Sequence, residues 1–289
     1  MNNTQTSNPR SAQSKYKNRE DLAATGERLK LSAHVPQGMG GIYTFPLELP
    51  FRQGDEGIVK TTIIGTTGCS TCVGVYIPID DDRCFAAHFD GASYKRPRNS
   101  SVYQVPDALA EYFKLAVKTS LDHVFKGKEQ DVETIRRRED LKARAVVVST
   151  WLVVGGQKGP GFYIIDVLCD YFQLDKLKLA SKCSAHHGFV VDHCDQSSQS
   201  LHLLGWTRPA PDEKVFDEIS KLADSCPEPG WDEKFMSIYR TTYEWVMPWN
   251  AGWWARPLLN AGEKKPFRFR YYHDEAESGK GRGKWGVGP

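Results

Sequence analysis

Residues 66–75 read TTGCSTCVGV, and this stretch decides how the neighbouring segments of the chain fold. A Thr-Thr-Gly turn at its start separates two apolar, β-branched runs, residues 58–64 and residues 72–79, which both have the length and composition of a strand. A third run of this kind, residues 84–89, follows the acidic turn at residues 80–82. Because the connections are short, the three predicted strands bring the residues at their ends close together in space.

The chain that follows these strands alternates between helix and strand patterns. Pro106 and Asp107 open a helix in which apolar residues recur every three or four positions as far as residue 125. Residues 145–154 form an apolar run, which predicts a buried strand, and residues 162–174 repeat the helical spacing. These patterns predict an α/β fold.

Four segments differ in composition. They are a polar, disordered lead-in at residues 1–30, one α/β domain at residues 31–205, an aromatic-rich extension packed on this domain at residues 206–274, and a disordered tail rich in Gly, Lys and Arg at residues 275–289. The sequence contains no internal repeat.

The formal net charge of the chain is +2, so its overall charge indicates neither a nucleic acid nor an anionic membrane as a partner. Residues 1–20 lack the apolar segment of a secretory signal, and no run approaches the roughly 18 apolar residues of a membrane span. The seven cysteines are an odd number in a chain of ordinary size, which favours reduced thiols over a disulfide framework. The sequence therefore predicts a cytoplasmic protein.

Cys72 and His88 have the residue types and the setting of a nucleophile and its base. A thiol is a useful nucleophile when it is partly ionised beside an imidazole that accepts and returns protons. Cys72 follows the Gly-containing turn, where backbone N–H groups face a developing oxyanion, and His88 lies near the end of the third predicted strand. Thr66 adds a hydroxyl that orients the imidazole, as the third member of a catalytic triad does.

The stretch at residues 66–75, together with the Ala-His pair that ends at His88, resembles the active-site signature of the chemoreceptor glutamine deamidases, the CheD family. Those proteins have a Thr, a Gly two residues later, a Cys-Val pair four residues after that Gly, and an Ala-His pair after the next strand. The order of the predicted elements is also similar over residues 57–192. The resemblance implies a CheD-like four-layer α/β/β/α sandwich, a fold shared with the cytotoxic necrotizing factor toxins, here with a C-terminal aromatic-rich extension.

The resemblance also implies a reaction and the residues that carry it. The family's catalytic residues fall on Thr66, Cys72 and His88, and support for the substrate or the oxyanion falls on Gly68, Thr71 and Val73. In that chemistry the thiolate attacks the carboxamide of a glutamine side chain, ammonia leaves, and water hydrolyses the thioester to glutamate. The implied activity is that of a protein-glutamine glutaminase. Its partner is a protein that presents a glutamine, and it requires neither a metal nor an organic cofactor.

The same segment also contains the residue types of a structural zinc site. Cys69 and Cys72 have the spacing of a Cys pair on a tight turn, and Cys84 with His88 offers a second pair of ligands. The alternative is therefore a non-catalytic binding protein on the same scaffold, either with zinc at these four residues or with partners that bind the aromatic C-terminal part. The two hypotheses differ at Cys72, which is a reactive thiol in the first and a metal ligand in the second.

Other clusters favour simpler interpretations. A second group of metal-binding residue types is made of Cys183, His186, His187, His193 and Cys194. Because adjacent residues on a strand point to opposite faces, packing roles are favoured there over metal binding. The Gly-rich loop at residues 155–161 lacks the Gly-Lys-Ser/Thr ending of a phosphate loop, and the tryptophans of residues 245–254 are interpreted as packing residues.

Overall fold

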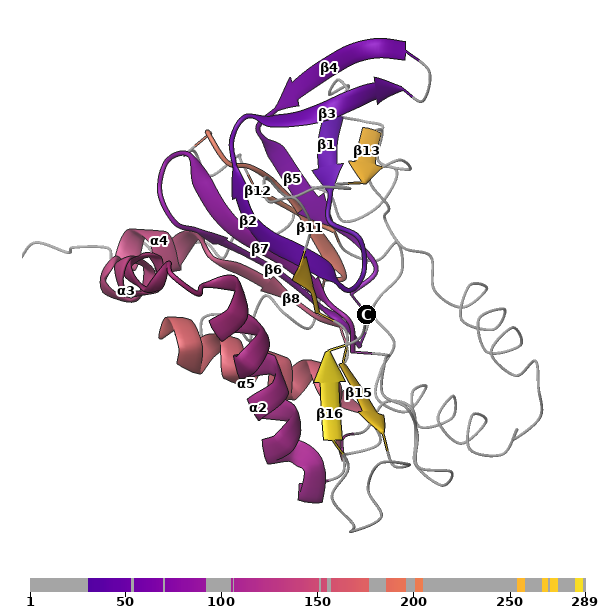
Figure 1. The fold of residues 1–289 in the computed structure, drawn as a ribbon, viewed down its shortest axis with the longest axis vertical. Coiled ribbons are helices and arrows are strands. Elements are labelled where there is room, and N and C mark those ends of the chain that lie inside the picture. Colours follow the sequence, from indigo (N-terminus) through magenta and orange to yellow (C-terminus); the bar gives the residue numbers. More distant parts are fainter. Residues whose placement is uncertain are drawn as a thin grey trace, which may run out of the picture.

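Figure 1 presents the computed structural model of the 289-residue chain, whose described part is a mixed α/β fold with several sheets and a few helices. The structure describes residues 31–52, 55–69, 71–91, 105, 107–150, 152–154, 157–176, 186–195, 201–204, 254–257, 267–269, 271–274 and 284–287. The predicted lead-in lies outside the described residues, as do most of the predicted extension and tail.

One sheet is built around β5, the strand that leads into the Thr-Thr-Gly turn. Its five strands lie in the order β12 (Leu201–Leu204), β11 (Gly188–Asp192), β5 (Ile63–Thr66), β1 (Leu31–His34) and β13 (Trp254–Pro257). Strand β1 runs parallel to β5 and β13, whereas β11 runs antiparallel to β5 and β12. All residues of β5 are buried, so this β5 sheet has its central strand in the interior.

The second sheet contains the hairpin predicted from residues 72–89. Its five strands, all antiparallel, lie in the order β14 (Phe267–Arg268), β2 (Met39–Thr44), β7 (Arg83–Phe89), β6 (Val73–Pro78) and β8 (Val146–Val148). The hairpin between β6 and β7 closes where the Ile79 N–H donates to the Arg83 carbonyl at 2.8 Å. We refer to this sheet as the β6–β7 sheet.

Short ladders and helices complete the described elements. The ladders pair β3 (Leu47–Arg52) with β4 (Asp55–Thr61), β9 (Val153–Val154) with β10 (Gln157–Lys158), and β15 (Tyr271–Asp274) with β16 (Lys284–Val287). The helices are α2 (Asp107–Val124), α3 (Glu129–Arg137), α4 (Glu139–Arg144) and α5 (Pro160–Phe172). None of these described helices is both long and apolar enough to cross a membrane.

The two sheets pack face to face, and helices cover the other face of the β6–β7 sheet (Figure 1). Alternate residues of a strand point to opposite faces. On the helical side, the Phe85 ring of β7 lies 5.9 Å from the Phe172 ring of α5. On the other side, the Tyr76 ring of β6 lies 6.3 Å from the Phe189 ring of β11. The described elements thus form three layers: helices, the β6–β7 sheet and the β5 sheet.

The predicted helices correspond to α2 and α5, but the predicted strand at residues 58–64 is divided. It belongs to β4 and β5, which are separated at Thr62. The hydroxyl of Thr61 accepts a hydrogen bond from the Ile63 N–H at 3.1 Å, and such a local bond competes with the ladder between strands. Strand β5 can therefore turn away from β4 and enter the other sheet.

The predicted strand at residues 145–154 is divided for a different reason. After β8 the backbone N–H of Thr150 donates to the carbonyl of Cys69 at 3.0 Å, and the chain leaves the ladder there. This interruption ties the end of β8 to the turn between β5 and β6. The break in the strand therefore serves the candidate site.

Candidate active site

The candidate site lies where β5 ends and β6 begins. In the connecting turn, Gly68 has a φ of 79°, which a residue without a side chain adopts without strain. The Cys69 N–H donates to the His187 carbonyl at 2.7 Å, while the Cys69 carbonyl accepts from the Thr150 N–H at 3.0 Å. Neighbouring segments therefore hold this turn from two sides.

The structure brings Thr66 and His88 together across the two sheets. Thr66 ends β5, His88 lies in β7, and Thr66 Oγ1 is 2.8 Å from His88 Nδ1. The Thr66 hydroxyl donates its own proton to the Val35 carbonyl, also at 2.8 Å. Because a hydroxyl has one proton, its oxygen accepts from an Nδ1–H, which leaves the lone pair of the imidazole on Nε2. This contact therefore holds His88 in the tautomer that a general base at Nε2 requires.

Burial keeps the His88 imidazole neutral. The side chain is 2% exposed, and burial, followed by the proximity of His34, lowers its pKa to about 3, against an opposing effect of Asp90. Burial also lowers the pKa of His34. A neutral imidazole accepts a proton from a thiol, and an imidazolium in this environment gives the proton up readily.

Gly74 provides the space in which these groups meet. It pairs with His88 in the ladder between β6 and β7. A Cβ atom at this position would lie 2.8 Å from Thr66 Cγ2, 2.9 Å from Cys69 Sγ and 3.1 Å from Val148 Cγ2. Even the smallest side chain at residue 74 would therefore push against the residues that contact His88.

We expect Gly74→Ala to lower the free energy of unfolding by about 2 kcal/mol, because the added methyl overpacks a buried site. Urea denaturation measures this change. Gly127→Ala is the comparison: its surroundings are open within 4 Å, but its φ of 74° makes a side chain cost about 1 kcal/mol. Cys69→Ala in the Gly74→Ala background should recover part of the loss, whereas strictly additive costs would contradict the contact.

Cys69 lies against the His88 ring without alignment to either nitrogen. Its Sγ is 3.8 Å from Nε2 and 4.0 Å from Nδ1. A sulfur in line with one nitrogen would lie much farther from the other, so the thiol rests beside the ring. Burial, followed by the proximity of Cys72, raises the pKa of the Cys69 thiol well above its ordinary value. Cys69 is therefore a protonated packing residue.

Cys72 lies on the same face of the hairpin as His88. Val73 pairs with Phe89, so the residue before Val73 comes opposite Asp90, and His88 is the diagonal neighbour of Cys72. The Cys72 side chain is 3% exposed. This register makes Cys72 and His88 diagonal neighbours, and both the approach of their side chains and their catalytic roles stay predictions.

Three groups surround the Cys72 sulfur. The backbone N–H of Gly91 donates to it at 3.4 Å, and the side-chain amide of Gln37 donates to it at 3.6 Å. The sulfur is also 3.8 Å from Oδ1 of Asp90, which accepts the thiol proton. N–H groups that point at a sulfur favour its thiolate form.

The backbone around Cys72 is enclosed by glycines and by a helix end. A Cβ atom on Gly91 would lie 2.2 Å from the Thr71 carbonyl oxygen, and a Cβ atom on Gly161 would lie 3.2 Å from it. Gly161 belongs to the first turn of α5, so the positive end of that helix lies beside the segment that carries Cys72. The helix end thus lies against the Thr71 carbonyl, one residue before Cys72.

The three residues predicted to support the substrate or the oxyanion have other contacts. The Gly68 N–H donates to His187 Nδ1 at 3.2 Å, and the Val73 side chain packs in the core on the helical side. Thr71 contributes the carbonyl that lies against Gly91. The backbone N–H that contacts the Cys72 sulfur belongs to Gly91, which the sequence prediction did not include.

Asp90 and Gln37 are the other residues that the sequence prediction missed. A signal for Asp90 exists in the sequence, because it follows His88 by two positions and strand residues two apart share a face. Gln37 lies in a turn far from these strands in sequence. Its approach to Cys72 depends on the pairing of β2 with β7, which local patterns do not predict.

The proposed zinc ligands do not gather at one point. Among the described residues, no group of three or more His, Cys, Asp and Glu side chains is placed to hold a metal ion. Cys84 pairs with Pro78 at the end of the ladder that is remote from His88. Burial, followed by the proximity of Asp80, raises the pKa of the Cys84 thiol well above its ordinary value, so it stays protonated.

The second group of histidines and cysteines is also dispersed. Cys183 lies outside the described residues. His187 accepts the hydrogen bond from the site turn, whereas His193 stacks on Phe45 with ring centroids 4.3 Å apart. The Nδ1 atom of His193 lies 2.8 Å from the hydroxyl of Tyr76. His193 is therefore a packing residue, as the sequence prediction favoured, and His187 supports the candidate site.

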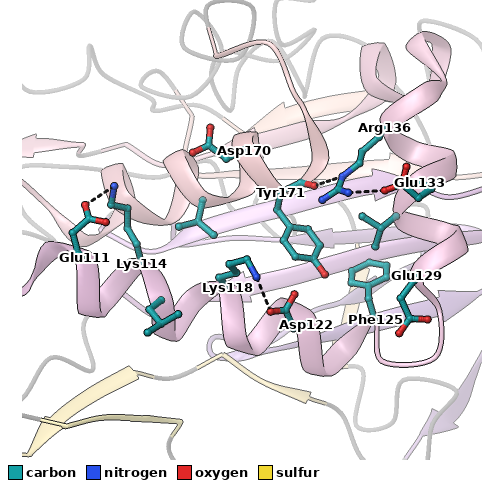
Figure 2. Close-up of a pocket in the computed structure, with 13 residues that line it drawn as sticks. Glu111, Lys114, Lys118, Asp122, Phe125, Glu129, Glu133, Arg136, Asp170 and Tyr171 are labelled. Carbon is teal, nitrogen blue, oxygen red and sulfur yellow. Dashed lines mark hydrogen bonds and ion pairs between the residues drawn. The ribbon is translucent and has the colours of Figure 1, made fainter.

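A groove of about 820 Å³ lies elsewhere, among α2, α3 and α5 (Figure 2). Its charged side chains pair with one another: Lys118 with Asp122 at 2.9 Å, and Arg136 with Glu133 at 2.6 Å. The helical layer and the β6–β7 sheet separate it from His88, which points to the other face of that sheet. The groove therefore belongs to the helical surface and not to the candidate site.

The function of Thr66, Cys72 and His88 can be argued only from their chemistry. Comparison of the chain with models of known protein families, with curated proteins and with solved structures finds no match. The assignment of function therefore rests on the geometry of these side chains.

Proposed function

We propose that the protein is a cysteine-dependent amidohydrolase that converts glutamine side chains of a protein substrate to glutamate with release of ammonia. The observation that carries the proposal is the 2.8 Å contact between Thr66 Oγ1 and His88 Nδ1, which leaves Nε2 as the base. Cys72 lies diagonally from His88 on the same face, with two N–H groups directed at its sulfur. A nucleophile, a base and an orienting hydroxyl are thus within one buried cluster.

The proposed reaction uses one base twice. His88 Nε2 takes the thiol proton of Cys72, the sulfur bonds to the carboxamide carbon, and the C–N bond breaks as His88 returns the proton to the leaving nitrogen. Water then loses a proton to His88 and attacks the thioester. The C–S bond breaks, the sulfur recovers a proton, and one amide plus one water have become one acid and one ammonia.

The resemblance to the chemoreceptor glutamine deamidases enters as part of the same proposal. The resemblance implies a four-layer α/β/β/α sandwich. The described helical layer and the two sheets are consistent with three of these four layers. The proposal also includes a protein that presents a glutamine as the substrate, and a cytoplasmic location.

The proposal predicts that a glutamine-containing peptide will release ammonia in the presence of the protein and will acquire the mass of the acid. The matched asparagine peptide should react far more slowly, because its shorter side chain does not reach a sulfur that is 3% exposed. Mass spectrometry of the peptide and an ammonia assay measure both products.

Protection from alkylation tests the same site independently. The glutamine peptide should slow the labelling of Cys72 by iodoacetamide and leave that of the exposed Cys194 unchanged. If a broad set of glutamine peptides neither releases ammonia nor protects Cys72, the proposed function is wrong.

A further inference from the structure

Gln37 places a carboxamide on the Cys72 sulfur. Its Nε2 donates to Cys72 Sγ at 3.6 Å and to Asp90 Oδ1 at 3.0 Å. An amide nitrogen of this kind carries two protons, so it can make both bonds at once. Gln37 is exposed, whereas Cys72 and Asp90 are buried, at 3% and 7% exposure. The carboxamide therefore enters the site from the solvent side.

The turn that carries Gln37 is fixed in position. It connects β1 to β2, and the Met39 N–H donates to the Pro36 carbonyl at 3.1 Å. Gly38 has a φ of 72°, which is the conformation that a type II turn requires at its third residue. The Gly38 N–H donates to the carbonyl of His88 at 2.8 Å. The turn thus rests on the strand that carries His88 and aims the side chain of Gln37 at the thiol.

The charges around this nitrogen favour an amide over an acid. The Asp90 carboxylate and a Cys72 thiolate are both negative and 3.8 Å apart, so each opposes the other. An amide NH2 group places two protons between them and relieves this repulsion, whereas a carboxylate would add a third negative charge. The same pair of groups therefore accepts a glutamine side chain and repels a glutamate side chain.

We propose that Asp90 is the specificity-determining residue that binds the NH2 group of the substrate carboxamide, and that Gln37 occupies this subsite until a substrate displaces it. The inference rests on the proposed function for the identity of the substrate. To that function the inference adds Gln37, which competes with the substrate for the subsite, and Asp90, a hydrogen-bond acceptor that distinguishes an amide from an acid. Asp90, which binds the glutamine side chain of the substrate, then also repels the glutamate side chain of the product.

Alkylation kinetics test both parts of the inference without an assay of ammonia. Gln37→Ala should raise the rate of Cys72 labelling by iodoacetamide roughly tenfold, because uncovering the sulfur outweighs the loss of one of its two N–H donors. Gln130→Ala, a substitution of an exposed glutamine on α3, is the matched control and should leave the rate unchanged. An equal labelling rate in Gln37→Ala and the unaltered protein would overturn the proposed occupancy by Gln37.

The role of Asp90 is tested with two alkylating reagents, one of which carries an amide group and the other an acid group. In the Gln37→Ala protein, iodoacetamide should outpace iodoacetate at Cys72, relative to their rates with a free thiol. Asp90→Asn should lower that ratio roughly tenfold by removal of the negative charge. A second measurement leaves Asp90 intact and uses the Gln37→Ala protein. Propionamide should slow the labelling of Cys72 by iodoacetamide, whereas propionate and N,N-dimethylpropionamide should not. If all three compounds act alike, Asp90 does not select an amide.

These results separate the inference from the proposed function. Protection by propionamide without any ammonia release would support the amide subsite and contradict the deamidase reaction. Ammonia release without amide selectivity would support the reaction and overturn the role of Asp90.

Discussion

Cys72→Ser is expected to lower ammonia release from a glutamine peptide by at least about 1,000-fold. The hydroxyl of serine is far less acidic and far less nucleophilic than a thiol, so its attack on the carboxamide carbon would be much slower. Initial rates of ammonia production with the Cys72→Ser protein measure this loss.

Two other cysteines provide the controls for this substitution. Cys194→Ser changes an exposed thiol and should retain the full rate. Cys69→Ala removes the thiol beside the His88 ring and should retain at least about a tenth of the rate, because its raised pKa makes it a poor nucleophile. If Cys69→Ala abolishes the reaction while Cys72→Ser preserves it, the nucleophile has been assigned to the wrong cysteine.

The free energy of unfolding is expected to fall as the pH is lowered below about 6.5. The His88 pKa is about 3 in the folded protein, chiefly because of burial, and 6.5 in an unfolded chain, so only the unfolded chain takes up a proton between these values. Stability is therefore fully present above pH 6.5 and is lost progressively toward pH 3. His88 alone contributes at most about 1.4 kcal/mol per pH unit, or about 5 kcal/mol in total.

Urea denaturation between about pH 7.5 and pH 4.5 measures this dependence, above the range in which most carboxylates titrate. His34 and His193 act in the same direction, since burial lowers the pKa of both. His88→Gln should flatten the dependence, and His123→Gln, on the exposed side of α2, should leave it unchanged. A slope that His88→Gln leaves intact would show that His88 is not the buried neutral group.

Local patterns predicted the elements whose periodicity is strong. The runs at residues 72–79 and 84–89 correspond to β6 and β7, and the helical spacing after Pro106 corresponds to α2. Strand β2 was not predicted, because its glycines have low strand propensity. A Cβ atom on Gly40 would lie 2.4 Å from Ala87 Cβ, so this strand depends on a close approach to β7 that a single sequence does not show.

Helix α3 lies in a charged stretch of the sequence, residues 126–142. It exists because Val132 and Ile135 are buried against the other helices, while Arg136 pairs with Glu133 at 2.6 Å in the groove beside α5. Its few apolar residues are too sparse to give a clear helical period. Packing against a partner therefore decides the structure of this segment.

The candidate site could be predicted as far as residue type and strand order allow. The sequence prediction grouped Thr66, Cys72 and His88, and the structure brings Thr66 Oγ1 to 2.8 Å from the His88 ring. The position of the Cys69 sulfur, 3.8 Å from His88 Nε2, could not be predicted, since it depends on the conformation of the turn. Gln37 was missed because its place depends on a turn anchored to the carbonyl of His88.

The contact between Thr66 and His88 crosses from one sheet to the other, so under the proposed function the site depends on how the two sheets dock. A displacement of one sheet by a single residue, roughly 3.3 Å, would exceed the reach of a hydrogen bond. A chain in which each sheet has formed but the two sheets have not docked would therefore lack the contact between Thr66 and His88. Under the proposed function, the site would therefore be complete only in a chain whose two sheets have docked.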